Sequence, residues 1–258
     1  MRHYQVMGVS LRDYSVRESM RRITLYMNNG SCNTMDFITH DVLLKAADSE
    51  ALKSGLEQMD ITVCTSGDIL QAGSIMSRSR EREIESNLLL KGMLRKFAKE
   101  GRGLFLIAEN MDGLTRFEQS LYKFNEDLNI VGRCAVSEVV GSDDSIVNEV
   151  NNSLPDVVFI NLPSPRAESF IQENRMKFHT QLVAALRDVC LKVTEDGRVK
   201  QGGIGNMILR RFFHSAAKKF TREENKVTGE TGNIINITGD AKTEEESPKI
   251  VQIGPRDS

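Results

Sequence analysis

The sequence predicts an α/β fold, Rossmann-like, in which a largely parallel sheet carries helices on both faces. Short apolar runs alternate with longer amphipathic stretches through residues 1–200, as expected for strands joined by crossover helices. Charged residues make up 27% and hydrophobic residues 40% of the chain, which is ordinary for a globular protein. A length of 258 residues suffices for one large domain with appendages.

Five apolar runs have the length and composition of buried strands. The expected strands are 34–40, 60–66, 103–109, 156–162 and one around 183–193, the last being open to a helical interpretation. The expected helices are 41–59, 83–100, 113–128, 144–153 and 166–178. Periodicity supports them: in the third helix the apolar residues recur at intervals of three and four, so they share one face. These residues are Leu114, Phe117, Leu121 and Phe124.

Composition divides the chain into three parts. Residues 1–200 carry the α/β pattern, and residues 201–220 form a basic amphipathic extension. Residues 221–258 are rich in Glu, Thr, Gly, Asn and Lys, a composition typical of a disordered tail. Two isoleucine-rich patches in that tail, at 233–237 and 250–253, could instead dock as strands.

Charge and cysteine usage argue against several classes of protein. A formal net charge of −2 argues against a dedicated nucleic-acid binder, which normally carries a strongly basic domain. We see no apolar secretory segment and no run as long as a membrane-spanning helix, so we expect a cytoplasmic protein. The four cysteines and four histidines are scattered, so we expect reduced thiols and no metal site.

Three connections are the expected place for a ligand, because ligands of doubly wound sheets bind beyond the carboxyl ends of the strands. These connections are 39–41, 65–68 and 161–168. The third follows a strand in "PDVVFINLPSPRAESFI", where a loop with two prolines leads into a helix. We therefore expect the three loops to converge on one cleft.

Taken in this order, the segments of residues 4–213 resemble the WecG/TagA/CpsF family of bacterial glycosyltransferases. The resemblance begins with "YQVMGVSLRDYSVRESM", similar to the family's opening strand and helix, and continues through "FITHDVLLKAADSEALKSGLEQMDITV" and "GLFLIAENMDGLTRF". It is clearest at "NEVNNSLPDVVFINLPSPRAESFI". It implies transfer of an N-acetylhexosamine-type sugar from a UDP-sugar donor to a polyprenyl-diphosphate-linked acceptor, in cell-envelope polysaccharide synthesis. We see no acidic cluster that would hold a divalent ion beside a diphosphate, so we expect no metal or other cofactor.

Part of the family's functional pattern is kept. Thr39 and Asp41 resemble the family's Thr-x-Asn, with aspartate in place of asparagine, and Arg82 resembles its arginine before a Gly-Ser-Asp-Leu run. Arg166 and Glu168 resemble the second and fourth residues of its Pro-Lys-Gln-Glu motif. The substrate-binding residues that the resemblance implies are Thr39, Asp41, Thr65, Arg82, Arg166 and Glu168.

Other positions have changed. Thr65 stands where the family has its catalytic aspartate, and its hydroxyl is not basic enough near neutral pH to accept a proton. Ala167 replaces the motif's glutamine, and a glycine pair has become Ala108-Glu109. A later Gly-Gly-Ala-Phe-Asp segment is missing. Asp68, at the same strand end as Thr65, is the candidate catalytic base; alternatively it caps the following helix.

These changes leave two functions open. The chain could be an active, divergent glycosyltransferase in which Arg82 and Arg166 clamp a diphosphate, although both arginines could instead form surface ion pairs. It could also be a catalytically inactive homologue that binds a nucleotide-sugar or partners an active transferase. A homo-oligomer is compatible with either function.

The basic extension suggests a membrane contact. Within residues 204–220, lysines and arginines alternate with apolar residues at helical spacing, as in a helix lying on anionic lipid at the inner face of the cell membrane. The alternative is a helix docked on the sheet with a solvated basic edge. Nucleic acid is not an expected partner.

Overall fold

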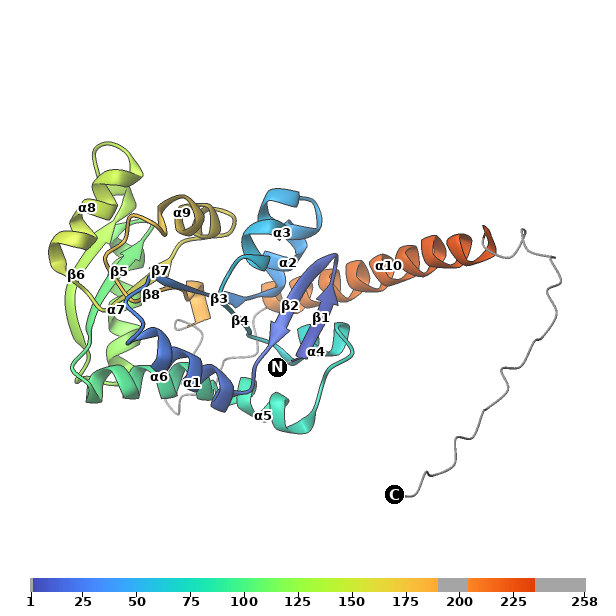
Figure 1. Cartoon of the computed structure of the whole chain (residues 1–258), viewed down its shortest axis with the longest axis horizontal. Coiled ribbons are helices and arrows are strands. Elements are labelled where there is room, and N and C mark those ends of the chain that lie inside the picture. The colour runs from blue at the N-terminus through green and yellow to red at the C-terminus, as the bar shows by residue number, and fades with distance from the viewer. Residues whose placement is uncertain (1, 190–203, 235–258) are drawn as a thin grey trace, which may run out of the picture. The chain divides into compact units, whose positions relative to one another are not determined.

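The computed structural model describes residues 2–189 and 204–234 (Figure 1). Residues 1–221 form one compact unit and residues 222–258 form a second. The predicted α/β fold is confirmed, since a six-stranded parallel sheet is flanked by helices. Most of the expected disordered tail, at 235–258, lies outside the described residues.

The sheet has the strand order β4-β3-β8-β7-β5-β6. Its strands are β3 (Asn33–Ile38), β4 (Ile61–Cys64), β5 (Gly103–Ala108), β6 (Asn129–Ala135), β7 (Val157–Asn161) and β8 (Leu182–Ala185). β8 enters between β3 and β7, so that Leu182 lies opposite both Asn33 and Val157. Because the strands are parallel, their carboxyl ends meet at one edge of the sheet, as the sequence predicted.

Helices cover both faces of this sheet. The helices are α1 (Val16–Tyr26), α2 (His40–Ala47), α3 (Glu50–Glu57), α4 (Gly67–Ala72), α5 (Arg78–Glu85), α6 (Leu88–Lys99), α7 (Met111–Phe124), α8 (Asp143–Ser153), α9 (Arg166–Asn174) and α10 (Ile204–Ile234), with short 3-10 turns η1 (Val136–Glu138) and η2 (Arg187–Val189). Leu104 and Leu106 of β5 pack with α1, α6 and α7, whereas Phe105 and Ile107 pack with α8 and α9. Alternate residues of a strand point to opposite faces, so the two helix groups lie on opposite sides, as Figure 1 shows for α6 and α9.

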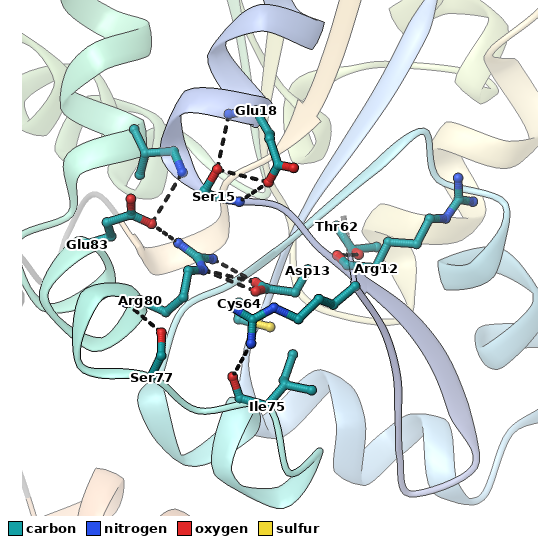
Figure 2. Close-up of polar contacts among 12 residues, drawn as sticks. Arg12, Asp13, Ser15, Glu18, Thr62, Cys64, Ile75, Ser77, Arg80 and Glu83 are labelled. Atoms are coloured by element: carbon teal, nitrogen blue, oxygen red, sulfur yellow. Dashed lines mark hydrogen bonds and ion pairs between the residues drawn. The ribbon is translucent and has the colours of Figure 1, made fainter.

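An N-terminal hairpin stands beside the main sheet. Its strands β1 (Arg2–Val6) and β2 (Val9–Asp13) are antiparallel and turn at Met7-Gly8, where both residues have positive φ, as a two-residue turn of this kind requires. The family resemblance implies only one strand and a helix here. Figure 2 shows Arg80 of α5 between Asp13 and Glu83, with a nitrogen 2.7 Å from an Asp13 carboxylate oxygen. This buried ion pair fastens the hairpin to α5.

Three expected elements differ from the structure. The helix expected at 41–59 is broken into α2 and α3, because Ser49 interrupts it and caps the second helix. The helix expected at 83–100 is also divided, because Asn87 adopts a left-handed conformation; residues 83–85 belong to α5, and α6 starts at Leu88. The strand expected around 183–193 ends at Ala185, and its last residues, from 190, lie outside the described part.

One face of α10 is docked on this unit. Phe213 is fully buried among side chains of the hairpin, α2 and α4, and its ring lies 4.7 Å from that of His40. A Cβ placed on Gly8 would lie 3.3 Å from the Phe220 ring, so the hairpin turn and α10 are in close contact. The neighbouring Phe212 is 65% exposed.

Docking of α10 should stabilise the protein through the buried Phe213 and not through the exposed Phe212. Phe213→Ala should lower the free energy of unfolding by about 3–5 kcal/mol, because it removes a fully buried ring. Phe212→Ala should change it by less than about 0.5 kcal/mol. Urea unfolding followed by circular dichroism measures both, and equal effects of the two substitutions would contradict the docking.

Candidate functional site

The ends of β3 and β4 are joined at the predicted edge. Thr65 donates from both its backbone N–H and its hydroxyl to the Ile38 carbonyl, over 3.2 and 2.8 Å. Thr39 is the N-cap of α2, its hydroxyl oxygen accepting from the Val42 N–H. The structure thus brings Thr39 and Thr65 together, but both hydroxyl groups already serve the backbone.

A carboxylate and three basic side chains meet beside these threonines. Asp68 is in the first turn of α4, and its carboxylate lies 2.6 Å from Nε of Arg210 in α10. The imidazoles of His40 and His214 each lie 3.6 Å from it. Burial raises the pKa of Asp68, but the hydrogen bond and charge of Arg210, with both histidines, outweigh burial and hold that pKa below its ordinary value.

The alternative role of Asp68 as a helix cap is wrong in this structure. Ser66 is the N-cap of α4, accepting from the Asp68 N–H, while the Asp68 side chain faces α10. As a carboxylate with a lowered pKa, Asp68 is a weak proton acceptor while Arg210 is bound to it. It would become more basic if α10 moved away.

A buried arginine links β8 to β3 and to α9. Arg187, just after β8, donates to both carboxylate oxygens of Asp36 in β3 and to Glu168 in α9. It also donates to the Phe37 carbonyl over 2.8 Å. Burial lowers the pKa of Arg187, but Asp36 and Glu168 outweigh burial and raise that pKa above its ordinary value, so the guanidinium stays charged. Glu168 is therefore a partner of Arg187 and faces away from solvent.

The β7–α9 connection is fastened to its neighbours on two sides. Lys45 of α2 donates to the Ser164 carbonyl over 3.0 Å and pairs with Asp41 at 2.8 Å. On the other side, Arg166 forms a bidentate pair with Asp143 at the start of α8. The side chain of Arg166 is thus directed toward α8.

Arg82 lies apart from these contacts. It occupies the last turn of α5, and its side chain is exposed and makes no ion pair or hydrogen bond with any residue that the structure describes. Its neighbour Arg80 is the buried arginine of this helix. The structure therefore brings together Thr39, Asp41, Thr65 and Asp68 at this edge. It buries Glu168 against Arg187 and leaves the side chains of Arg82 and Arg166 outside this group.

Sequence reasoning missed the residues that hold this edge together. Asp36 carried a signal, since an acidic residue inside an apolar strand needs a buried partner. Arg187 and Arg210 carried none, because their partners lie 151 and 142 residues away in the chain. His40 and His214 are far apart in the sequence, yet both meet Asp68.

Two searches of the described residues gave negative results. No group of three or more His, Cys, Asp or Glu side chains in ranges 2–189 and 204–234 is placed to hold a metal ion. Among the helices described, none is both long and apolar enough to cross a membrane.

Comparison with known proteins identifies a family for this chain. The model for the family described as "Glycosyl transferase WecG/TagA/CpsF family" matches residues 4–190, from β1 to the residue after η2. No curated protein matches the chain. The matched range includes Thr39, Thr65, Asp68 and Glu168, whereas α10 lies outside it.

Arg210 should control the protonation of Asp68. Arg210→Gln should raise the pKa of Asp68, because it removes the strongest interaction favouring the carboxylate and leaves the effect of burial. Arg211→Gln, on the exposed neighbour, should leave that pKa unchanged. Carboxyl-carbon NMR titration measures both, and an unshifted Asp68 in Arg210→Gln would contradict the contact.

Proposed function

The chain belongs to the WecG/TagA/CpsF family of glycosyl transferases, and on that premise we propose that it transfers an N-acetylhexosamine-type sugar from a UDP-sugar to a polyprenyl-diphosphate-linked acceptor. The reaction serves cell-envelope polysaccharide synthesis. The observation that carries this proposal is the family match, which extends over the whole parallel sheet. The meeting of Thr39, Thr65 and Asp68 at the carboxyl edge supports it, since that edge is where such sheets bind ligands.

In this proposal Asp68 removes the proton from the acceptor hydroxyl. It is the carboxylate nearest in sequence to Thr65, which occupies the family's catalytic position. Departure of Arg210 would expose Asp68 and make it more basic, while the freed guanidinium could contact the diphosphate. The substrate site would then be lined or supported by Thr39, Asp41, Thr65 and Glu168. The diphosphate would be contacted by Arg82 and Arg166 only after their side chains turned toward it.

A second function is favoured by a specific observation. Five of the six proposed substrate-binding side chains already have a partner within the chain, and Thr65 cannot act as a base. A protein of this family that keeps the fold but not the chemistry would bind a nucleotide-sugar, or an active transferase, without turnover. The two functions differ in whether UDP is released.

Turnover should depend on Asp68. With UDP-N-acetylmannosamine or UDP-N-acetylglucosamine and a lipid-linked acceptor, Asp68→Asn should lower the rate of UDP release by about 10²–10⁴-fold, as loss of a general base does. Asp144→Asn should leave the rate unchanged, because this side chain is 63% exposed on α8 and pairs with Lys177. A coupled assay for UDP measures the rate, and circular dichroism checks that each variant is folded.

The outcomes separate the two functions. An undiminished rate in Asp68→Asn would eliminate Asp68 as the base. Calorimetric binding of a UDP-sugar without UDP release would favour the inactive homologue. Absence of binding would contradict both the transferase and the nucleotide-sugar binder, and would leave only a partner of an active transferase.

We also propose that α10 contacts the membrane at its inner face, where a lipid-linked acceptor would be presented. Opposite the docked side of this helix, a second face remains exposed and mixes apolar with basic residues, as interfacial helices do. The exposed residues are Met207, Ile208, Arg211, Phe212, Lys218 and Lys219. Docking of Phe213 on the folded unit leaves this face available. A helix docked on the protein and a helix lying on lipid, the two alternatives for the extension, are therefore compatible.

Membrane binding should therefore depend on the exposed apolar residues of α10. The double variant Ile208→Glu, Phe212→Glu should lose sedimentation with vesicles rich in anionic lipid, because it puts two acidic groups on the lipid-facing side. Leu25→Glu, at a residue 67% exposed on α1, should sediment as the unchanged protein does. Equal sedimentation of all three would refute the contact.

A further inference from the structure

Three ionisable side chains are buried together where β3, β8 and α9 meet. Asp36 is fully buried, Glu168 is 2% exposed and Arg187 is 7% exposed. Two carboxyl groups thus share one guanidinium. If both carboxyl groups were ionised, the cluster would hold one uncompensated negative charge away from water, which is costly.

The hydrogen bonds of this cluster are unevenly distributed. Both oxygens of Asp36 accept from Arg187, and Oε1 of Glu168 accepts from Arg187 and from the Ser164 hydroxyl, the latter over 2.9 Å. Oε2 of Glu168 is buried and has no hydrogen-bond partner among the described residues. That oxygen could bear a proton without displacing any of these hydrogen bonds.

Among the residues that the structure describes, no further positive charge compensates the cluster. The electrostatic interactions that act on Asp36 come from Arg187 and Glu168. From α2, Lys45 reaches the Ser164 carbonyl but is paired with Asp41. From α3, Gly55 faces Glu168, since a Cβ placed on Gly55 would lie 3.9 Å from the Glu168 Cβ, and glycine brings no charge.

We propose that Asp36 and Glu168 share a single proton over Arg187, so that the folded protein binds, in the weakly acidic range, a proton that the unfolded chain does not hold. Loss of this proton leaves two carboxylates competing for one guanidinium. The connection between β3, β8 and the β7–α9 loop is weakened as a result, so the edge that carries the candidate site is sensitive to pH. The inference does not depend on the proposed transferase activity.

The direction of the pH effect follows from the buried aspartate. Burial, together with the charge of Glu168, raises the pKa of Asp36 from 3.8 to about 6, although Arg187 opposes the rise. A carboxyl group whose pKa is higher in the folded state favours folding fully below its unfolded pKa, and this contribution is lost as the pH rises through the folded pKa.

Glu168→Gln tests the proposal, because it keeps the size of the side chain and leaves a single carboxylate opposite Arg187. Urea unfolding should be followed from about pH 5 to about pH 7.5, a range spanning the folded pKa. Over this range the unfolding equilibrium constant of the unchanged protein should rise by about 10-fold relative to that of Glu168→Gln. Asp144→Asn removes an exposed carboxylate whose pKa is lowered, so it should keep the pH dependence of the unchanged protein.

Identical pH dependence in the unchanged protein and in Glu168→Gln would overturn the proposal. If that variant does not fold, infrared spectroscopy of the unchanged protein decides. A carbonyl stretch from a protonated, buried carboxyl group should be present at about pH 5 and disappear by about pH 7.5. Its absence at the lower pH would equally refute the shared proton.

Discussion

The edge of the sheet depends on one guanidinium group placed where water cannot reach it. Arg187 follows β8, which lies between β3 and β7. It contacts Asp36 of β3 on one side and, on the other, Glu168 of α9, the helix that follows β7. An arginine at this depth is tolerated only because carboxylates surround it. It adopts a positive φ, a conformation that most residues avoid, so its placement is maintained by the partners that surround it.

The fold could be predicted from the sequence because it rests on local patterns. The run that became β5 is apolar throughout, and the run that became β7 is apolar up to its last residue, Asn161. The helix α7 repeats its apolar residues at helical spacing, so these elements could be predicted without knowledge of distant residues. The breaks at Ser49 and Asn87 were missed, because apolar residues continue on both sides of each. The candidate site was harder still. Its loops were located by the rule for parallel sheets, but the pairing of Asp68 with Arg210 depends on α10 folding back, which no local pattern records.

The apolar residues of α10 lie on two faces of the helix, one docked and one exposed. Phe213, Ala216 and Ala217 face the hairpin and α2, while Phe212 faces solvent one residue away. This division explains why the extension could not be assigned from periodicity alone, since the pattern of a docked helix and that of an interfacial helix are superimposed. It also places Arg210 and His214 at the border, beside Asp68.

The contact between Gly8 and Phe220 joins two segments made at opposite times during synthesis. The hairpin leaves the ribosome before the helix that covers it, since that helix is translated after the six strands of the parallel sheet. Bringing together residues so far apart in the chain carries an entropic cost, which the contacts of α10 must offset. While α10 is still being synthesised, Phe213 cannot yet cover the hairpin, and Asp68 has not yet met Arg210.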